Sequence, residues 1–134
     1  MQPTLSLGLA LASGYFICGA VANSGFAASC NSFSFGRDGT SWEMVANCAY
    51  PDGTYNVATV INLGKCITNA GGTMYAQVNG GFGASCPSAS LSGTVITASC
   101  GNGAGGYVTS SLDLNTFVGN QNGILCCFGI CGGP

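Results

Sequence analysis

Polar and apolar residues alternate along short segments of this chain, a pattern typical of half-buried β-strands. Residues 32–35 read Ser-Phe-Ser-Phe, and residues 42–48 follow them beyond an Arg-Asp-Gly-Thr turn. Further strands are predicted over residues 55–61, 73–78, 88–91, 94–99, 107–112 and 124–128. Residues 62–67 and 113–119 are expected to be short connectors, and turns are expected at 69–72 and 120–123. Short strands separated by glycine-containing turns predict an all-β fold.

The chain also contains an internal repeat. Phe26 and Cys30 recur in the same order as Phe82 and Cys86. Five more landmarks follow in matching order: Cys48 and Cys100, Tyr55 and Tyr107, Leu63 and Leu114, Asn69 and Asn120, Gly72 and Gly123. One copy alone is too small to bury a useful core. The two copies are therefore expected to complete each other in one domain with rough two-fold symmetry and two related surface sites.

The domain plan begins with an apolar N-terminal segment. Residues 5–17 are mainly apolar and Ala20-Val21-Ala22 has the small-x-small pattern of a cleavage site, so residues 1–22 are predicted to be a secretory signal. A membrane anchor or a buried helix is the alternative, but the stretch is short and interrupted by glycine. The mature single domain would span 23–134, with repeat one at 26–78, a flexible hinge at 79–81, repeat two at 82–127 and a tail at 128–134. The protein is expected to be secreted, as a monomer or a hinge-swapped dimer.

The cysteine count agrees with export. One of the nine cysteines, Cys18, lies in the predicted signal, and the remaining even number predicts a disulfide framework. The repeat matches the local pair Cys30–Cys48 with the local pair Cys86–Cys100. The others have no counterpart and are expected to form two further bonds that attach the tail to the end of repeat one: Cys66, Cys126, Cys127 and Cys131. Adjacent strand residues point to opposite faces, so Cys126 and Cys127 should not pair with each other.

Charge and chemistry exclude several function classes. Charged residues make up 4% of the chain and the net charge is −2, which gives no basic surface for nucleic acid or for anionic membranes. There is no histidine and no CxxC motif, so neither a metal site nor a cofactor is expected. Asp38 and Glu43 are candidates for a glycoside-hydrolase carboxylate pair, but a solvated hairpin end explains both. No enzymatic activity is expected.

Repeat two carries motifs of a known family. A cysteine closes a short hairpin, Gly-Gly-Tyr follows at 105–107, Ser-Leu-Asp-Leu-Asn at 111–115, and Asn-Gln-Asn-Gly-Ile-Leu at 120–125. Together they resemble the cyanovirin-N homology domain, and repeat one is a looser copy of the same series. The resemblance spans residues 26–127. It implies an elongated protein of two pseudo-symmetric lobes, each containing parts of both repeats, in a family that includes mannose-binding lectins with one sugar site per lobe.

By position, the resemblance implies two carbohydrate sites. Site one would use Ala28, Ser29, Ala49, Tyr50, Pro51, Asn120, Gln121 and Asn122. Site two would use Thr68, Asn69, Gly71, Ala84, Ser85, Gly101, Asn102, Gly103 and Gly105. Ala28, Ala49 and Ala84 stand where sugar-binding members carry polar or charged side chains. Site one is expected to be the better equipped, although turn chemistry also explains Asn120 to Gly123, and a strand surface explains the two serines.

Two functions remain open at this point. The first is a metal-independent lectin that recognises mannose-type glycans through hydrogen bonds from loop polar groups. The alternative is a disulfide-rich secreted structural or effector protein that keeps the fold without binding sugar.

Overall fold

The computed structural model describes residues 24–133, so the predicted signal at 1–22 lies outside the described residues. In chain order, the elements are η1 (Phe26–Ala28), β1 (Cys30–Asp38), β2 (Ser41–Ala49), β3 (Tyr55–Asn62), η2 (Leu63–Lys65), β4 (Ile67–Ala70), β5 (Thr73–Ala76), η3 (Phe82–Ala84), β6 (Ser88–Ser92), β7 (Val95–Gly101), β8 (Tyr107–Asp113), η4 (Leu114–Thr116), β9 (Val118–Gln121), β10 (Ile124–Cys127) and β11 (Ile130–Cys131). The η elements are single 3₁₀ turns, and the all-β class is confirmed. Within the described part of the chain, no helix is long and apolar enough to cross a membrane.

Each repeat forms an antiparallel three-stranded sheet followed by a hairpin. Repeat one gives the sheet β1-β2-β3 and the hairpin β4-β5, and repeat two gives β6-β7-β8 and β9-β10, to which β11 adds an edge. The central strand β2 alternates buried and half-buried residues along its whole length, which is the alternation that its sequence predicts.

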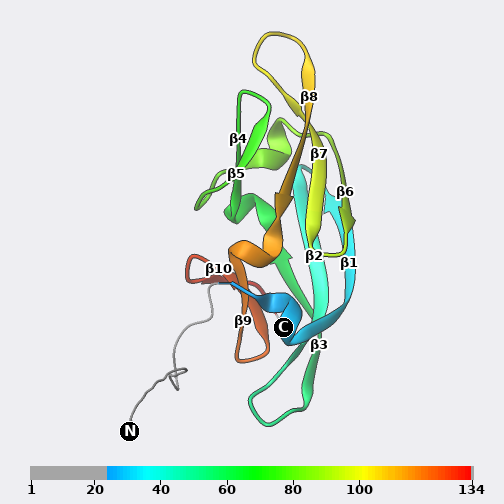
Figure 1. The fold of residues 1–134 in the computed structure, drawn as a ribbon, viewed down its shortest axis with the longest axis vertical. Helices are drawn as coiled ribbons and strands as arrows, with labels where there is room; N and C mark the ends of the chain where they lie inside the picture. The colour runs from blue at the N-terminus through cyan, green and yellow to red at the C-terminus, as the bar shows by residue number, and fades with distance from the viewer. Residues whose placement is uncertain (1–23, 134) are drawn as a thin grey trace, which may run out of the picture.

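The hairpins cross over to the other repeat (Figure 1). On the sheet β1-β2-β3, the backbone N–H of Leu125 donates to Thr59 Oγ1 at 3.3 Å. On the sheet β6-β7-β8, the N–H of Met74 donates to Ser110 Oγ at 2.9 Å. We call β1-β2-β3 with β9-β10-β11 lobe one, and β6-β7-β8 with β4-β5 lobe two. Each lobe of the elongated molecule therefore contains both repeats, as the resemblance implies.

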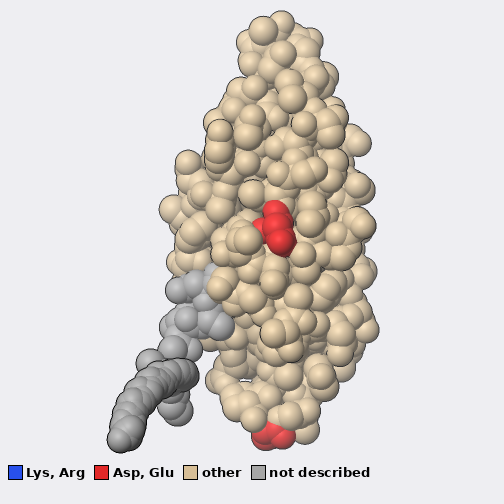
Figure 2. Space-filling view, in the orientation of Figure 1, with Lys and Arg blue, Asp and Glu red and all other residues tan. Residues whose placement is uncertain are grey.

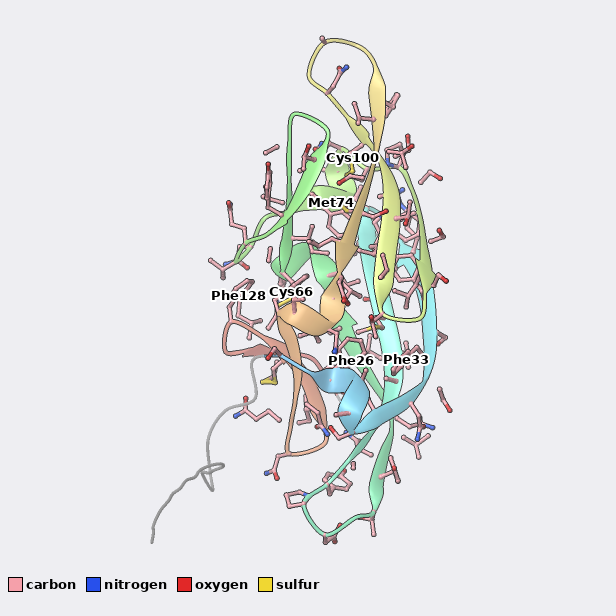
Figure 3. All side chains as sticks on the ribbon, in the orientation of Figure 1. Phe26, Phe33, Cys66, Met74, Cys100 and Phe128 are labelled. Carbon is pink, nitrogen blue, oxygen red and sulfur yellow. A yellow bond between two sulfur atoms is a disulfide. The ribbon has the colours of Figure 1, made fainter. Side chains whose placement is uncertain are left out.

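A single apolar core runs through both lobes, and the repeat landmarks lie in it. Phe26 and Phe82 are fully buried, as are Leu63 and Leu114. Phe26 packs against Phe33 with ring centroids 5.1 Å apart (Figure 3). Burying an aromatic or leucine side chain contributes about 1.5–3 kcal/mol. The matched large residues therefore supply much of the stability that joins the two repeats.

Four disulfide bonds involve the eight cysteines of the described residues. The predicted Cys30–Cys48 and Cys86–Cys100 bonds are confirmed. Cys66 bonds to Cys127 and joins the end of repeat one to β10, as expected. The remaining expectation was wrong, because Cys126 bonds locally to Cys131. The tail folds back as β11 and places Cys131 opposite Cys126 on the neighbouring strand.

The two predicted turns begin later than expected. Asn69 and Asn120 are strand residues, and the loops contain only Gly71-Gly72 and Asn122-Gly123, all with positive φ. Such two-residue loops match the twist of the strands on either side. The ends of the two predicted connectors therefore become the strands β4 and β9.

The segment 79–81 that joins the repeats is held by backbone hydrogen bonds. Asn79 N–H donates to Lys65 O at 2.8 Å, and Gly81 N–H donates to Gly64 O at 2.7 Å. A Cβ on Gly80 would lie 2.4 Å from Ile67 O, so glycine is required there by close backbone contact. In this structure the expected flexible hinge packs tightly against η2 and β4.

Candidate functional site

The two ends of the molecule share one polar arrangement, which we call the amide clamp. In lobe one, Asn120 Nδ2 donates to Ser29 Oγ and to Ala49 O, both at 2.9 Å. Asn120 Oδ1 accepts the N–H of Gly123 at 2.8 Å. Because the acceptors come from repeat one and the amide from repeat two, the clamp joins the two repeats within one lobe.

Lobe two repeats this clamp bond for bond. Asn69 Nδ2 donates to Ser85 Oγ and to Gly101 O, both at 2.9 Å, and Asn69 Oδ1 accepts the N–H of Gly72 at 2.8 Å. Both amide hydrogens and the oxygen of each asparagine therefore have partners inside the protein. The serines retain a hydroxyl hydrogen for an outside acceptor.

The lobes differ above the clamp. In lobe one, the Tyr50 ring packs on Gly123, where an added Cβ would lie 2.7 Å from Cδ1 and Cε1 of the ring. Asn56 Nδ2 closes the same side by donating to Gly123 O at 2.8 Å. Tyr50 itself is 39% exposed. The structure thus brings Ser29, Ala49 and Asn120 together in the clamp, with the Tyr50 ring on the neighbouring Gly123. The remaining residues of site one are exposed or half-buried: Ala28, Pro51, Gln121 and Asn122.

In lobe two, the residue after Gly101 is Asn102, and its side chain folds back onto its own loop. Asn102 Oδ1 accepts the N–H of Ala104 at 2.8 Å and of Gly106 at 3.1 Å. Val108 packs on Gly72, where an added Cβ would lie 2.9 Å from its Cβ and Cγ2. Beside the clamp, the surface has a hollow with a volume of about 440 Å³. We call this hollow the lobe-two depression, and its lining consists of Asn69, Gly71, Ser85, Gly101, Gly103 and Tyr107.

Tyr107 lines the depression but is not among the residues that the resemblance implies for site two. It is 64% exposed and pairs with Gly101 across β7 and β8. Its Cε1 lies 3.9 Å from where a Cβ on Gly101 would stand. The missing side chain at position 101 leaves the ring free beside the clamp. The other residues of site two lie on β4, η3 or the loop beyond the lining: Thr68, Ala84, Asn102 and Gly105.

The electrostatic character of both ends is close to neutral. One face of the molecule shows only two small acidic areas and no basic one (Figure 2). Hydrogen bonds from the hydroxyl and N–H of Thr54 hold the pKa of Asp52 below its ordinary value, in the loop beside Tyr50. No group of three or more potential metal-ligating side chains was found in residues 24–133. The chemistry that the lobe-two depression offers is hydrogen bonding beside an aromatic face.

Comparison with known proteins identifies the family. The model of the CVNH domain matches residues 4–75 and 82–133, which cover both repeats. The chain therefore belongs to the CVNH family, in agreement with the resemblance seen in its motifs.

Solved structures of the same fold agree with this assignment. A MoCVNH3 variant in complex with (N-GlcNAc)4 has a TM-score of 0.68 at 20% identity, over 81% of this chain and 99% of that chain. The microvirin–mannobiose complex has a TM-score of 0.65 at 20% identity, over 78% and 98%. The CVNH protein of T. borchii has a TM-score of 0.63 at 26% identity, over 76% and 97%.

Proposed function

We propose that this chain is a secreted lectin that binds mannose-type glycans through the lobe-two depression. Binding is reversible and needs no metal, cofactor or covalent step. The observation that carries the proposal is the position of the exposed Tyr107 ring beside the clamped Asn69–Ser85 pair and a row of glycines. The sequence alone favours site one, and we propose the lobe-two depression because a hollow of about 440 Å³ lies beside its clamp.

The chemistry of the depression suits a neutral sugar. An exposed aromatic ring offers an apolar surface to the C–H face of a pyranose. The Ser85 hydroxyl and the backbone groups of Gly101 and Gly103 can form hydrogen bonds with vicinal sugar hydroxyls. A volume of about 440 Å³ lies within the range of about 300–1,000 Å³ of small-molecule sites. Few side-chain donors line the depression, so we expect weak affinity for one sugar unit.

Relatives support the ligand class. The microvirin structure is a complex with mannobiose and the MoCVNH3 variant structure is a complex with (N-GlcNAc)4. We propose mannose-type oligosaccharides as the preferred ligand, with GlcNAc oligomers as the informative second probe. We also propose that residues 1–22 direct export and that the mature chain is a monomer, since segment 79–81 is held by backbone bonds.

The test is a calorimetric titration of the mature, oxidised protein with mannobiose and with (GlcNAc)4. Tyr107→Ala removes the aromatic face and should weaken binding about tenfold, the equivalent of about 1.4 kcal/mol. Tyr55→Ala is the matched control, because Tyr55 is the repeat-one counterpart and is 49% exposed. This control should retain the affinity of the original protein.

Two results would contradict the proposal. One is equal affinity in the original protein and in Tyr107→Ala. The other is the absence of heat with every probe, which would favour the non-lectin alternative of a disulfide-rich structural or effector protein. The second result must be accompanied by a native unfolding transition to exclude misfolding.

A further inference from the structure

The chain carries only six charged side chains, and most of them have a local structural position. The Arg37 guanidinium donates to the carbonyl oxygens of Gly39 at 2.7 Å and Gly83 at 3.3 Å, and lies 4.9 Å from the Trp42 ring centroid. Asp52 accepts two bonds from Thr54. Asp113 caps η4 by accepting the N–H of Asn115, and Asp38 ends β1 at the hairpin turn.

The remaining two charges, Glu43 and Lys65, line the same cavity. This cavity has a volume of about 280 Å³ and also includes Asn62, Val60 and Ile130 in its lining. We call it the tail hollow, since β11 forms one of its walls. A second hollow of about 290 Å³ shares Asn62 and Lys65 with it, which extends the polar surface toward Asn79. Neither overlaps the lobe-two depression.

The C-terminal tail is fixed in place as the wall of this hollow. Gly133 exchanges two backbone hydrogen bonds with Val60, at 3.1 and 3.0 Å, and Thr59 Oγ1 donates to Gly133 O at 2.9 Å. A Cβ on Gly132 would lie 1.7 Å from Val60 O, so only glycine allows this approach. The Cys126–Cys131 bond closes the turn that leads there. The Cys126–Cys131 bond lies outside both lobe sites. It fixes β11 in place as one side of the cavity that Glu43 and Lys65 line.

We propose that the tail hollow is an additional saccharide site, separate from both lobe sites, that binds one unit of a neutral glycan. The Glu43 carboxylate accepts hydrogen bonds from two neighbouring sugar hydroxyls, and the Lys65 ammonium donates to a third oxygen. Such charge-assisted bonds are stronger than the neutral bonds that the lobe-two depression offers. Val60 and Ile130 provide an aliphatic surface for the sugar's C–H face.

The balance of charge selects a neutral ligand. A simple anion would be attracted by Lys65 but repelled by the Glu43 carboxylate. A simple cation would be attracted by Glu43 but repelled by the Lys65 ammonium. A polyol satisfies both groups without opposing either. The hollow is near the lower limit of about 300 Å³ for small-molecule sites, which suits a single sugar unit. The ligand class rests on the proposed lectin function, while the position of the site does not.

The test is an NMR titration of the ¹⁵N-labelled mature, oxidised protein with mannobiose and, separately, with (GlcNAc)4. We expect shifts at the amides of Glu43, Lys65 and Ile130 that persist in the Tyr107→Ala variant. Glu43→Gln and Lys65→Gln should each weaken this set of shifts by about tenfold or more in apparent affinity. Asp38→Asn is the matched control, since it removes a carboxylate outside the hollow, and it should leave them unchanged.

The outcomes separate this proposal from the lectin proposal. Shifts confined to Gly101, Gly103 and Tyr107 would overturn the tail hollow and leave the lectin function standing. Shifts confined to the tail hollow would support it and overturn the role of the lobe-two depression. No shift with either probe would overturn both. Free glycine serves as a third probe, because its ammonium and carboxylate could pair with Glu43 and Lys65. Shifts at the tail hollow with glycine but not with sugar would also overturn the proposal.

Discussion

The two ends of the molecule carry the same amide clamp under different covers. Asn120 and Asn69 make matching hydrogen bonds of 2.8–2.9 Å, so the duplicated frame is intact in both lobes. The side chain over the turn glycine differs: it is the Tyr50 ring over Gly123 in lobe one and Val108 over Gly72 in lobe two, where Asn102 turns back into its loop. Two equivalent pairs of positions, Tyr50 with Asn102 and Asn56 with Val108, therefore give the two clamps different covers. The two repeats therefore share the hydrogen bonds of the clamp but differ in the side chains that lie beside it.

A second difference lies along the outer strands of the two lobes. Thr59 in lobe one is fully buried, because its hydroxyl lies between the N–H of Leu125 and the carbonyl of Gly133. Its counterpart Ser110 is half-buried and receives only the bond from Met74. Lobe one thus gains a covered strand edge from the tail, an arrangement that protects against pairing with other chains.

The largest loss of stability should come from removing the disulfide that joins the two lobes. Cys66–Cys127 closes a loop of 61 residues' separation, and removing it as Cys66→Ala/Cys127→Ala should cost about 4 kcal/mol of unfolding free energy. Urea denaturation followed by Trp42 fluorescence measures the loss. Both lobes should unfold together at the lower midpoint.

The local bond of the tail is the matched control for this experiment. Cys126→Ala/Cys131→Ala opens a separation of only 5 residues and should cost about 2 kcal/mol. We expect its effect on amide exchange to be confined to lobe one, near Val60 and Thr59. A larger loss for the short loop than for the long one would contradict this account of the tail.

The amide clamps should be equally important in the two lobes. Asn69→Ala and Asn120→Ala each remove three hydrogen bonds, which at about 1 kcal/mol each should cost about 2–3 kcal/mol. Thermal unfolding by calorimetry gives both values. Asn31→Ala, at an exposed position of β1, should change stability by less than about 0.5 kcal/mol. A clear difference in stability between the two clamp variants would show that the two clamps match in geometry but not in their contribution to stability.

The clamp result also shows what the sequence could and could not predict. The repeat series identified the landmarks Phe26, Leu63 and their partners, which are buried core residues, and it matched the two hairpin disulfides. It could not show that the asparagine amides are occupied, because their carbonyl acceptors, Ala49 and Gly101, come from the opposite repeat. Residues distant in the sequence supply that information only after folding.

The tail and Tyr107 were missed for related reasons. The Cys126–Cys131 bond depends on a turn at Phe128-Gly129, where both residues have positive φ, and a positive φ at phenylalanine has no sequence signal. Tyr107 was visible as a repeat landmark and as the start of a strand. Its availability as a binding surface depends on the glycine opposite it, at position 101, which only the strand register reveals.

Exchanging the covers tests the comparison directly. Tyr50→Asn gives lobe one the residue of lobe two, and it should add a second, weak site for mannobiose that is detected as new amide shifts at Ala49 and Asn122. The reciprocal Asn102→Tyr should cover the depression and weaken binding there about tenfold, the equivalent of about 1.4 kcal/mol. A Tyr50→Asn protein with a single unchanged site would mean that the clamp region of lobe one cannot bind sugar even when uncovered.

The smallest effect concerns the loops that carry the two covers, because they are closed by different chemistry. Asp52 receives two hydrogen bonds from Thr54 in lobe one, whereas Asn102 receives those of Ala104 and Gly106 in lobe two. The pKa of Asp52 is lowered by the Thr54 bonds, so their contribution is present above the ordinary carboxyl pKa and is lost as the pH falls through the lowered one. Amide protection at Thr54 should therefore decrease on acidification from about pH 5 to about pH 2, while that of Ala104 stays constant. Asp52→Asn should abolish this difference, and an equal pH response in both loops would show that the carboxylate does not close the first one.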